Sequence, residues 1–332
     1  MSEKKSLASL SLDLDNKWSY MKTHADEGWE SFPSYLDILV PRVLEFLDKH
    51  GLKITFFIVG QDAALEKNHA AIRAIADAGH EIGCHSYNHE PWLHLYSEQQ
   101  VEEEITRAEE QIEKVTGKKP IGFRGPGYSF SPTVLRVLAR HGYQYDASTL
   151  PTYIGPLARA YYFMTTKLTP EERESRKQLY GDLRDGFQPL RPYRWQLDGV
   201  KGGLIEIPVT TMPVFKIPFH VSYILYASRF SPFLARFYFR FALEMCKLTN
   251  TPPSLLLHPL DFLGCDDMKE LSFFPAMDLP SERKIELVDE LISTYSNQFE
   301  VVPLRKEAHA LADENKMSTL IPKLKSLGEN TP

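Results

Sequence analysis

The chain has 332 residues, 43% of them hydrophobic and 25% charged, which is a globular composition and excludes a disordered or fibrous protein. Its formal net charge is −6 and it has no run of five basic residues, so nucleic acid is not an expected partner. A cytoplasmic protein is expected for three reasons. The three cysteines have no C-x-x-C spacing, the N-terminus has no apolar leader, and the chain has no apolar span of ~20 residues.

The first half of the chain alternates short apolar runs with amphipathic segments, which is typical of βα units and a parallel sheet. Strands are expected at residues 6–15, 53–60, 80–86, 120–127 and 143–149. Helices are expected at 34–51, 68–79, 97–117 and 131–142. This order predicts an α/β fold, either a barrel or an open doubly wound sheet, with its site at the carboxyl ends of the strands.

The regular alternation stops near residue 150. Later elements are expected as strands at 204–210, 253–262 and 300–304 and as a helix at 281–299. The remaining features are an insertion at about 150–202, an aromatic segment at 214–245 and a polar tail at 314–332. Without a repeat or a low-complexity linker, the chain is expected to form one catalytic domain over residues 1–313.

Polar side chains follow the predicted strands at the same end of each. They are Asp13, Asp15, His85, His89, Arg124, Asp146 and His258. Carboxylate and imidazole ligands suit a borderline divalent metal such as zinc, and three protein ligands leave a position for water. Both a helical turn and a strand would bring His85 and His89 to one side, so their spacing is compatible with chelation in either geometry.

Each of these residues also has a plainer explanation. An H-x-x-x-H spacing often occurs by chance, and polar strand ends usually just enter solvent. Arg124 could form a surface pair, and His258 alone is more often a satisfied core histidine. The coincidence of all of them at one end of successive strands is what favours a metal site.

Five segments of the chain, SLDLDN, HSYNHE, FRGPGYS, YDAST and LLLHPLDF, resemble the five motifs of the polysaccharide deacetylase (NodB-homology) family, in the same order. The resemblance covers about residues 8–150 and 203–304. It implies a distorted (β/α) barrel of about seven strands, here interrupted by a long insertion.

The resemblance also implies a role for each motif residue. Asp15, His85 and His89 would bind one divalent metal ion, with zinc expected and cobalt, iron, manganese or nickel as alternatives. Asp13 would be the general base and His258 the general acid. Arg124 would orient Asp13, and Asp146 would orient His258. Donors to the substrate or its oxyanion are expected in the glycine-rich turn, at Gly127 and Tyr128.

These roles predict metal-dependent hydrolysis of an amide, most simply the deacetylation or deformylation of an N-acylated amino sugar. Allantoinase-like hydrolysis of a non-sugar amide is the alternative activity, and a catalytically silent sugar-binding module is the alternative without activity. Three departures from the family pattern favour a small substrate over a polymer. Leu14 separates the two aspartates, Thr149 replaces a tryptophan, and Gly125 and Gly127 are expected to open the cleft.

The aromatic segment 214–245 has ten phenylalanine and tyrosine residues interleaved with Lys216, Arg229, Arg236 and Arg240. It could pack over the barrel or form a homodimer interface, as aromatic clusters often do. It could instead contact the headgroups of the inner membrane face, which would suit a lipid-linked sugar substrate.

Overall fold

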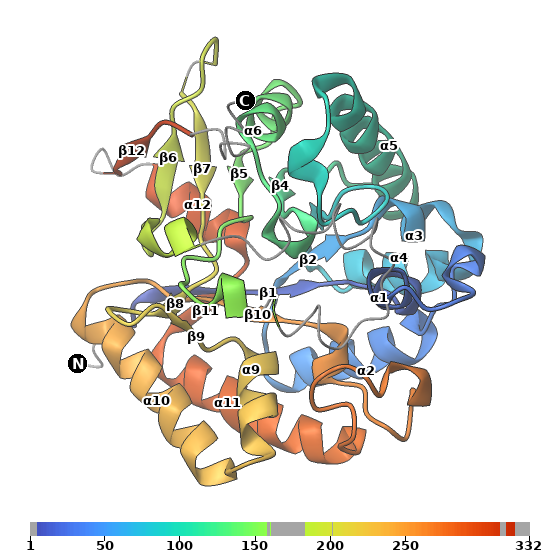
Figure 1. Ribbon diagram of the computed structural model, residues 1–332, viewed down its shortest axis with the longest axis vertical. Helices are drawn as coiled ribbons and strands as arrows, with labels where there is room; N and C mark the ends of the chain where they lie inside the picture. Colours follow the sequence, from blue (N-terminus) through green and yellow to red (C-terminus); the bar gives the residue numbers. More distant parts are fainter. Residues whose placement is uncertain (1–4, 158–159, 161–182, 201, 313–316, 323–332) are drawn as a thin grey trace, which may run out of the picture.

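The computed structural model describes residues 5–157, 160, 183–200, 202–312 and 317–322 (Figure 1). Nearly half of the insertion predicted at 150–202, and most of the predicted tail, lie outside the described residues. The division of the chain into one domain with an insertion therefore remains a proposal.

Seven parallel strands form the body of the sheet and curl around a shared core (Figure 1). In spatial order they are β10 (Ser254–Leu257), β1 (Leu7–Asp13), β2 (Thr55–Ile58), β3 (Glu81–Cys84), β4 (Gly122–Phe123), β5 (Tyr145–Asp146) and β7 (Leu204–Glu206). The predicted α/β barrel of about seven strands is confirmed, as a curled sheet whose two outer strands, β10 and β12, do not pair with each other within the described residues.

Three strands extend this body. The antiparallel β6 (Tyr193–Trp195) pairs with β7, and β12 (Thr319–Leu320) pairs with β6. The short β11 (Glu300–Val302) pairs with the beginning of β1. A separate hairpin joins β8 (Thr211–Met212) to β9 (Ile217–Pro218).

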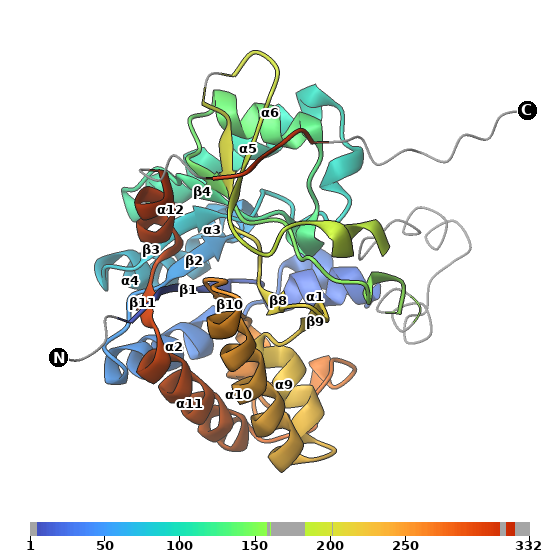
Figure 2. The same cartoon turned by 90° about the vertical axis from the view of Figure 1, so that its left-hand side faces the viewer.

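Helices cover the outside of the sheet (Figures 1 and 2). They are α1 (Lys17–His24), α2 (Leu36–Lys49), α3 (Gly60–Ala64), α4 (His69–Asp77), α5 (Glu98–Thr116), α6 (Pro132–Arg140), α9 (Val221–Ser228), α10 (Pro232–Leu248), α11 (Ser281–Gln298) and α12 (Leu304–Ala312). Among the described helices, none combines the length and the apolar character needed to cross a bilayer.

The helix boundaries follow from local sequence. The long α5 begins with a capping box, in which Ser97 and Gln100 each accept a hydrogen bond from the other's backbone N–H. It ends at Gly117, whose φ of 66° lies in the left-handed region that glycine adopts readily. In α2 the buried residues recur at helical spacing, so one stripe of the helix packs into the core.

The aromatic segment forms the β8–β9 turn, α9 and α10. The inner face of α10 is buried through Ala235, Phe239, Ala242, Leu243 and Cys246. The expectation that the segment packs over the barrel therefore holds for this face, while the outer face of the same helix remains exposed.

Candidate active site

The register of the parallel strands brings the predicted site residues to one edge of the sheet. Leu12 of β1 pairs with Leu257 of β10, so Asp13 and His258 follow on neighbouring strands. On the other side, Cys84 of β3 pairs with Phe123 of β4, so His85 and Arg124 also follow side by side. Residues far apart in sequence therefore meet at the carboxyl ends of the strands, where such folds place their sites.

Asp13 and Asp15 point to the same side because side chains alternate along an extended chain. Leu14 between them points the other way and is buried in the hydrophobic core. The D-x-D spacing thus delivers two carboxylates to the site and one apolar side chain to the core.

Asp15, His85 and His89 form a compact buried cluster. The Nε2 atoms of His89 and His85 lie 2.9 and 3.3 Å from the same oxygen, Oδ1 of Asp15. One potential ligand atom from each residue lies within 4.8 Å of the other two. On the far side of its ring, His85 donates from Nδ1 to the backbone oxygen of Arg124 at 2.6 Å. This bond places the proton on Nδ1 and leaves the Nε2 lone pair facing Asp15.

The two histidines come together through an irregular loop, and neither a helix nor a strand holds them. The strand β3 ends at Cys84, and both Ser86 and His89 adopt positive φ, 58° and 52°. Glu104 of α5 holds this loop, because its Oε2 accepts hydrogen bonds from the backbone N–H groups of Tyr87 and Asn88, each at 3.0 Å.

The electrostatics of the cluster favour an ionised carboxylate. Burial alone would raise the pKa of Asp15, but the charge of His89 and hydrogen bonds from both histidines outweigh burial and hold this pKa below its usual range. Burial would likewise lower the pKa of His85, but the charges of Asp13 and Asp15 raise it. A carboxylate already ionised and two converging imidazoles are the donor set of a divalent metal site.

Asp13 lies against Arg124, as the resemblance implied. Nη1 of Arg124 is 2.7 Å from Oδ1 of Asp13 and 2.8 Å from the hydroxyl of Ser11. Its Nε donates to the backbone oxygen of Ala147 at 2.9 Å, and its guanidinium carbon lies 4.4 Å from the centre of the Phe57 ring. The guanidinium is fully buried, so removal of Asp13 would leave an uncompensated charge.

His258 has partners other than the predicted Asp146. Its Nδ1 lies 3.1 Å from the hydroxyl of Ser222 on α9, and this hydroxyl donates to Oδ1 of Asp261 at 2.7 Å. The backbone N–H of His258 donates to Oδ2 of Asp261 at 2.8 Å. Among the described residues, Ser222 and Asp261 are the partners that lie beside His258 and no contact joins it to Asp146, so the orienting role expected for Asp146 stays a prediction.

Asp146 instead lies beside Glu206, its partner in the register of β5 and β7. Burial raises the pKa of Asp146 to about 6, and burial together with the Asp146 charge raises the pKa of Glu206 well above its usual range. The pair therefore retains a proton near neutral pH. Ser148 donates to Asp146 at 2.5 Å and accepts from the N–H of Gly125 at 2.8 Å, which connects the pair to the glycine-rich turn.

The turn itself is tight. A Cβ on Gly125 would come within 2.0 Å of the backbone oxygen of Ser129. The tight turn therefore requires this glycine, which was expected instead to open the cleft. Gly127 and Tyr128 both have a φ of 59°. The N–H of Tyr128 already donates to Gly125, whereas the N–H of Gly127 has no acceptor within the described part of the chain.

Three further residues lie at this site and were not predicted from the sequence, namely His220, Ser222 and Asp261. His220 is buried beside His258, with 5.4 Å between ring centres, and burial followed by the charges of His258 and Arg124 lowers its pKa well below its usual range. His220 and Ser222 lie in the aromatic segment, where no periodic signal marked them. Asp261 could have been found, because its position three residues after His258 matches a capping-box spacing.

Comparison with known proteins agrees with this geometry. The sequence model of the polysaccharide deacetylase family matches residues 23–145, which include His85, His89 and Arg124. A peptidoglycan deacetylase of Helicobacter pylori is 30% identical over 172 residues, 52% of this chain and 53% of that protein. A peptidoglycan-N-acetylmuramic acid deacetylase of Bacillus subtilis is 36% identical over 105 residues, 31% of this chain and 39% of that protein. The chain thus matches about half or less of the length of these relatives.

Solved structures support the fold. A Mycobacterium smegmatis structure that is itself assigned to the polysaccharide deacetylases has a TM-score of 0.63 at 21% identity, covering 98% of this chain and 96% of its own. The Puue allantoinase structure has a TM-score of 0.57 at 17% identity, covering 95% and 93% of the two chains. The family match, the curled sheet and the residues gathered at its edge lead to one conclusion: residues 23–145 match the polysaccharide deacetylase family, and the chain has the fold of that family's solved structures.

Proposed function

We propose that this protein is a metal-dependent hydrolase that removes an acyl group, acetyl or formyl, from the nitrogen of an amino sugar. The observation that carries the proposal is the convergence of two imidazole Nε2 atoms on one carboxylate oxygen of Asp15. Asp13 is the last residue of β1, two residues before Asp15, and His258 directly follows the adjacent strand β10. A base and an acid beside a metal cluster suit hydrolysis, whereas a silent binding module needs neither.

The residues present fit a divalent ion. Asp15, His85 and His89 would hold it, and the hydrogen bond from His85 to the Arg124 carbonyl is the type of outer contact that orients a metal-ligating imidazole. When bound, such an ion supplies Lewis-acid polarisation of an amide carbonyl and lowers the pKa of water towards ~7. Zinc is the proposed ion, since two imidazoles and a carboxylate match its preferences, with cobalt, iron, manganese and nickel as alternatives.

The protein's own side chains and backbone supply the proton acceptor, the oxyanion donors and the proton donor of the reaction. Asp13, held by Arg124, accepts the proton of the attacking water. The N–H of Gly127 has no backbone acceptor among the described residues and could stabilise the developing oxyanion, and the Tyr128 hydroxyl is the proposed substrate contact beside it. Burial, followed by the charge of Asp13, raises the pKa of Tyr128 well above its usual range, so its hydroxyl stays a donor. His258, oriented by Ser222 and Asp261, donates a proton to the departing amine.

The substrate proposal rests on the curated relatives, whose names specify deacetylation of peptidoglycan sugars. An N-acetylated amino sugar is common to peptidoglycan and to lipid-linked precursors of cell-envelope glycans. We therefore propose the N-acyl amino sugar as the unit recognised. A cytoplasmic location and a lipid-linked form of this sugar remain parts of the proposal.

An assay of acyl release tests the proposal directly. Purified protein loaded with zinc would be incubated with N-acetylglucosamine oligomers, peptidoglycan fragments, a lipid-linked N-acyl sugar and a ureide, and released acetate or formate would be measured. Release from a sugar substrate, abolished in Asp13→Asn, supports the proposal. Turnover of the ureide alone would replace it with the allantoinase-like activity, and no release from any substrate by metal-loaded protein would contradict hydrolysis.

A further inference from the structure

The outer face of α10 is the largest concentration of exposed apolar side chains in the described part of the molecule. Of the 16 large hydrophobic residues that are exposed there, nine lie between residues 214 and 248. On α10 and just before it, Phe230 and Phe233 are each 75% exposed and Phe237 is 59% exposed. In Figure 2, α10 lies between α11 and α9 at the front of the lower layer of the molecule.

This helix is apolar on two opposite sides. Its inner side packs into the core, and its outer side presents Phe233, Leu234, Phe237, Phe241 and Leu248, which are named here the outer seam. A helix that is hydrophobic all round is normally covered all round. The outer seam is therefore expected to have a partner that the isolated chain does not supply.

We propose that a second copy of this chain covers the outer seam, through antiparallel pairing of α10 with its own counterpart. Leu234, Phe237 and Phe241 recur at spacings of three and four, and Leu248 follows at seven, the repeat of helices that pack along an apolar seam. This inference does not depend on the proposed activity.

The seam is self-complementary under a two-fold axis at the level of Phe239. In an antiparallel pair centred there, Phe237 of one copy lies opposite Phe241 of the other. Leu234 lies opposite the stem of Glu244, whose carboxylate pairs with Lys247 at 2.9 Å at the border of the seam. A two-fold interface requires this kind of match, in which the same patch serves both copies.

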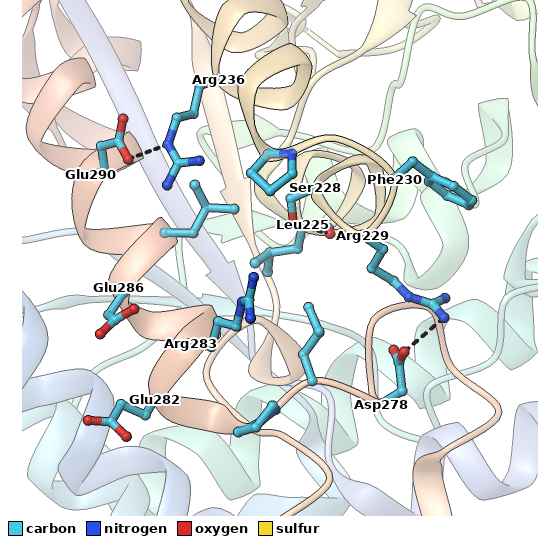
Figure 3. Close-up of a pocket in the computed structure, with 14 residues that line it drawn as sticks. Leu225, Ser228, Arg229, Phe230, Arg236, Asp278, Glu282, Arg283, Glu286 and Glu290 are labelled. Atoms are coloured by element: carbon cyan, nitrogen blue, oxygen red, sulfur yellow. Dashed lines mark hydrogen bonds and ion pairs between the residues drawn. The ribbon is translucent and has the colours of Figure 1, made fainter.

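The charges beside the seam favour a protein partner over a lipid surface. Nε of Arg236 lies 2.6 Å from Glu290 of α11, and Nη2 of Arg229 lies 2.8 Å from Asp278. Both pairs line a groove of about 880 Å³ between α10 and α11, with the arginines directed towards the acidic residues (Figure 3). Since these arginines already have carboxylate partners, they leave little net positive charge for anionic headgroups, which amphipathic membrane helices normally attract.

The available area fits a stable dimer. At ~200 Å² for a fully exposed ring, Phe230, Phe233, Phe237 and Phe241 alone present on the order of 500 Å². A specific interface buries about 800 Å² on each partner. The remaining area can come from Leu234, Leu248 and the exposed β8–β9 turn. This turn lies next to α10, because the Tyr238 hydroxyl donates to backbone oxygens of β9.

Sedimentation velocity of the full chain over a range of concentrations tests the proposal. We expect a dimer for the wild type and at least ~30-fold weaker association for Phe237→Ser, because a central aromatic residue of an interface contributes about 2 kcal/mol or more. Phe187→Ser is the matched control, since Phe187 is 78% exposed but lies outside the seam, and its dimer should be unchanged. Circular dichroism should be the same for all three proteins, because neither side chain is buried.

Cysteine cross-linking tests the orientation. A mixture of Phe237→Cys and Phe241→Cys proteins should form a disulfide-linked dimer under mild oxidation more readily than either variant alone. A wild type that stays monomeric at all concentrations, or a dimer that Phe237→Ser leaves intact, would overturn the proposal. So would a monomer that binds phosphatidylcholine–phosphatidylglycerol vesicles through Phe237, because the seam would then be a lipid contact.

Discussion

The metal-ligand cluster at the carboxyl end of the sheet and Glu307 at the amino end stabilise buried carboxyl groups in different protonation states. At the carboxyl end, Asp13 lies against Arg124, and Asp15 lies against two imidazoles. At the amino end, Glu307 of α12 is buried beside Ser9, and burial raises its pKa to about 7, which the Ser9 hydroxyl only partly offsets. The metal-ligand cluster therefore stabilises the charge of Asp15, whereas Glu307, like the Asp146–Glu206 pair, favours the neutral acid.

This contrast separates residues that serve activity from residues that affect only stability. The candidate site lies at the end of the sheet near α1 and the β8–β9 hairpin, whereas α12 and β11 lie at the opposite end (Figure 2). Substitutions at the first end should abolish metal binding or turnover. Substitutions at the second end should change the pH dependence of unfolding and leave turnover intact.

The largest effect is expected from the double variant His85→Ala, His89→Ala. It removes two of three proposed ligands, so stoichiometric metal and turnover should both be lost. Metal analysis of the purified protein measures this directly, with Asp13→Asn as the control that keeps all three ligands. Undiminished metal in the double variant would exclude the proposed site.

Asp13→Asn should come next. The substitution keeps the size of the side chain and removes the proposed base, so turnover should fall by ~10² or more while metal content stays unchanged. Initial rates of acyl release and metal content would be measured on the same preparation. Activity within threefold of the wild type would show that another group accepts the proton.

Asp261→Asn should have a smaller effect that distinguishes it from Asp146→Asn. Loss of an orienting partner typically lowers activity ~10- to 100-fold. Turnover of Asp261→Asn should therefore fall, and the acid-group inflection of its pH–rate profile should shift.

Ser222→Ala should show the same two changes, and Ser222→Thr should restore much of the activity. Asp146→Asn should leave the profile of His258 in place, because Asp146 faces Ser148 and Glu206. The same shift in Asp146→Asn would show that Asp146 orients His258, as the resemblance to the family implied.

The smallest effect is expected at the amino end. The pKa of Glu307 is raised in the folded protein, so its stabilising contribution is full below the unfolded value of ~4.5 and is lost as the pH rises through about 7. Glu307→Gln stays neutral and should lose less stability than the wild type between pH 5 and pH 8, by an amount on the order of 1 to 3 kcal/mol.

Urea denaturation at the two pH values measures this difference. Glu300→Gln is the control, because Glu300 is exposed and its pair with Lys306 lies at the surface. A parallel pH dependence for wild type and Glu307→Gln would show that this carboxyl group is not buried as a neutral acid. Turnover of Glu307→Gln should equal that of the wild type.

Much of the fold could be predicted because its signals are local. The apolar runs predicted β1, β2 and β3 to within a few residues, and the helix expected at 97–117 agrees closely with α5. Helix α1 and strand β6 were missed. The buried residues of α1 are three consecutive ones, so no helical stripe was visible, and β6 is a three-residue strand next to the insertion.

By itself, the sequence determined that polar residues follow successive strands and that Asp13 and Asp15 share a face, because alternation along a strand is a local property. Only the tertiary structure decided which polar residues become partners. The loop that brings His89 to His85 depends on Glu104 of α5, and His258 meets Ser222 because α9 packs beside β10. Neither contact has a local signal, since each joins residues whose separation along the chain carries no information about their distance in space.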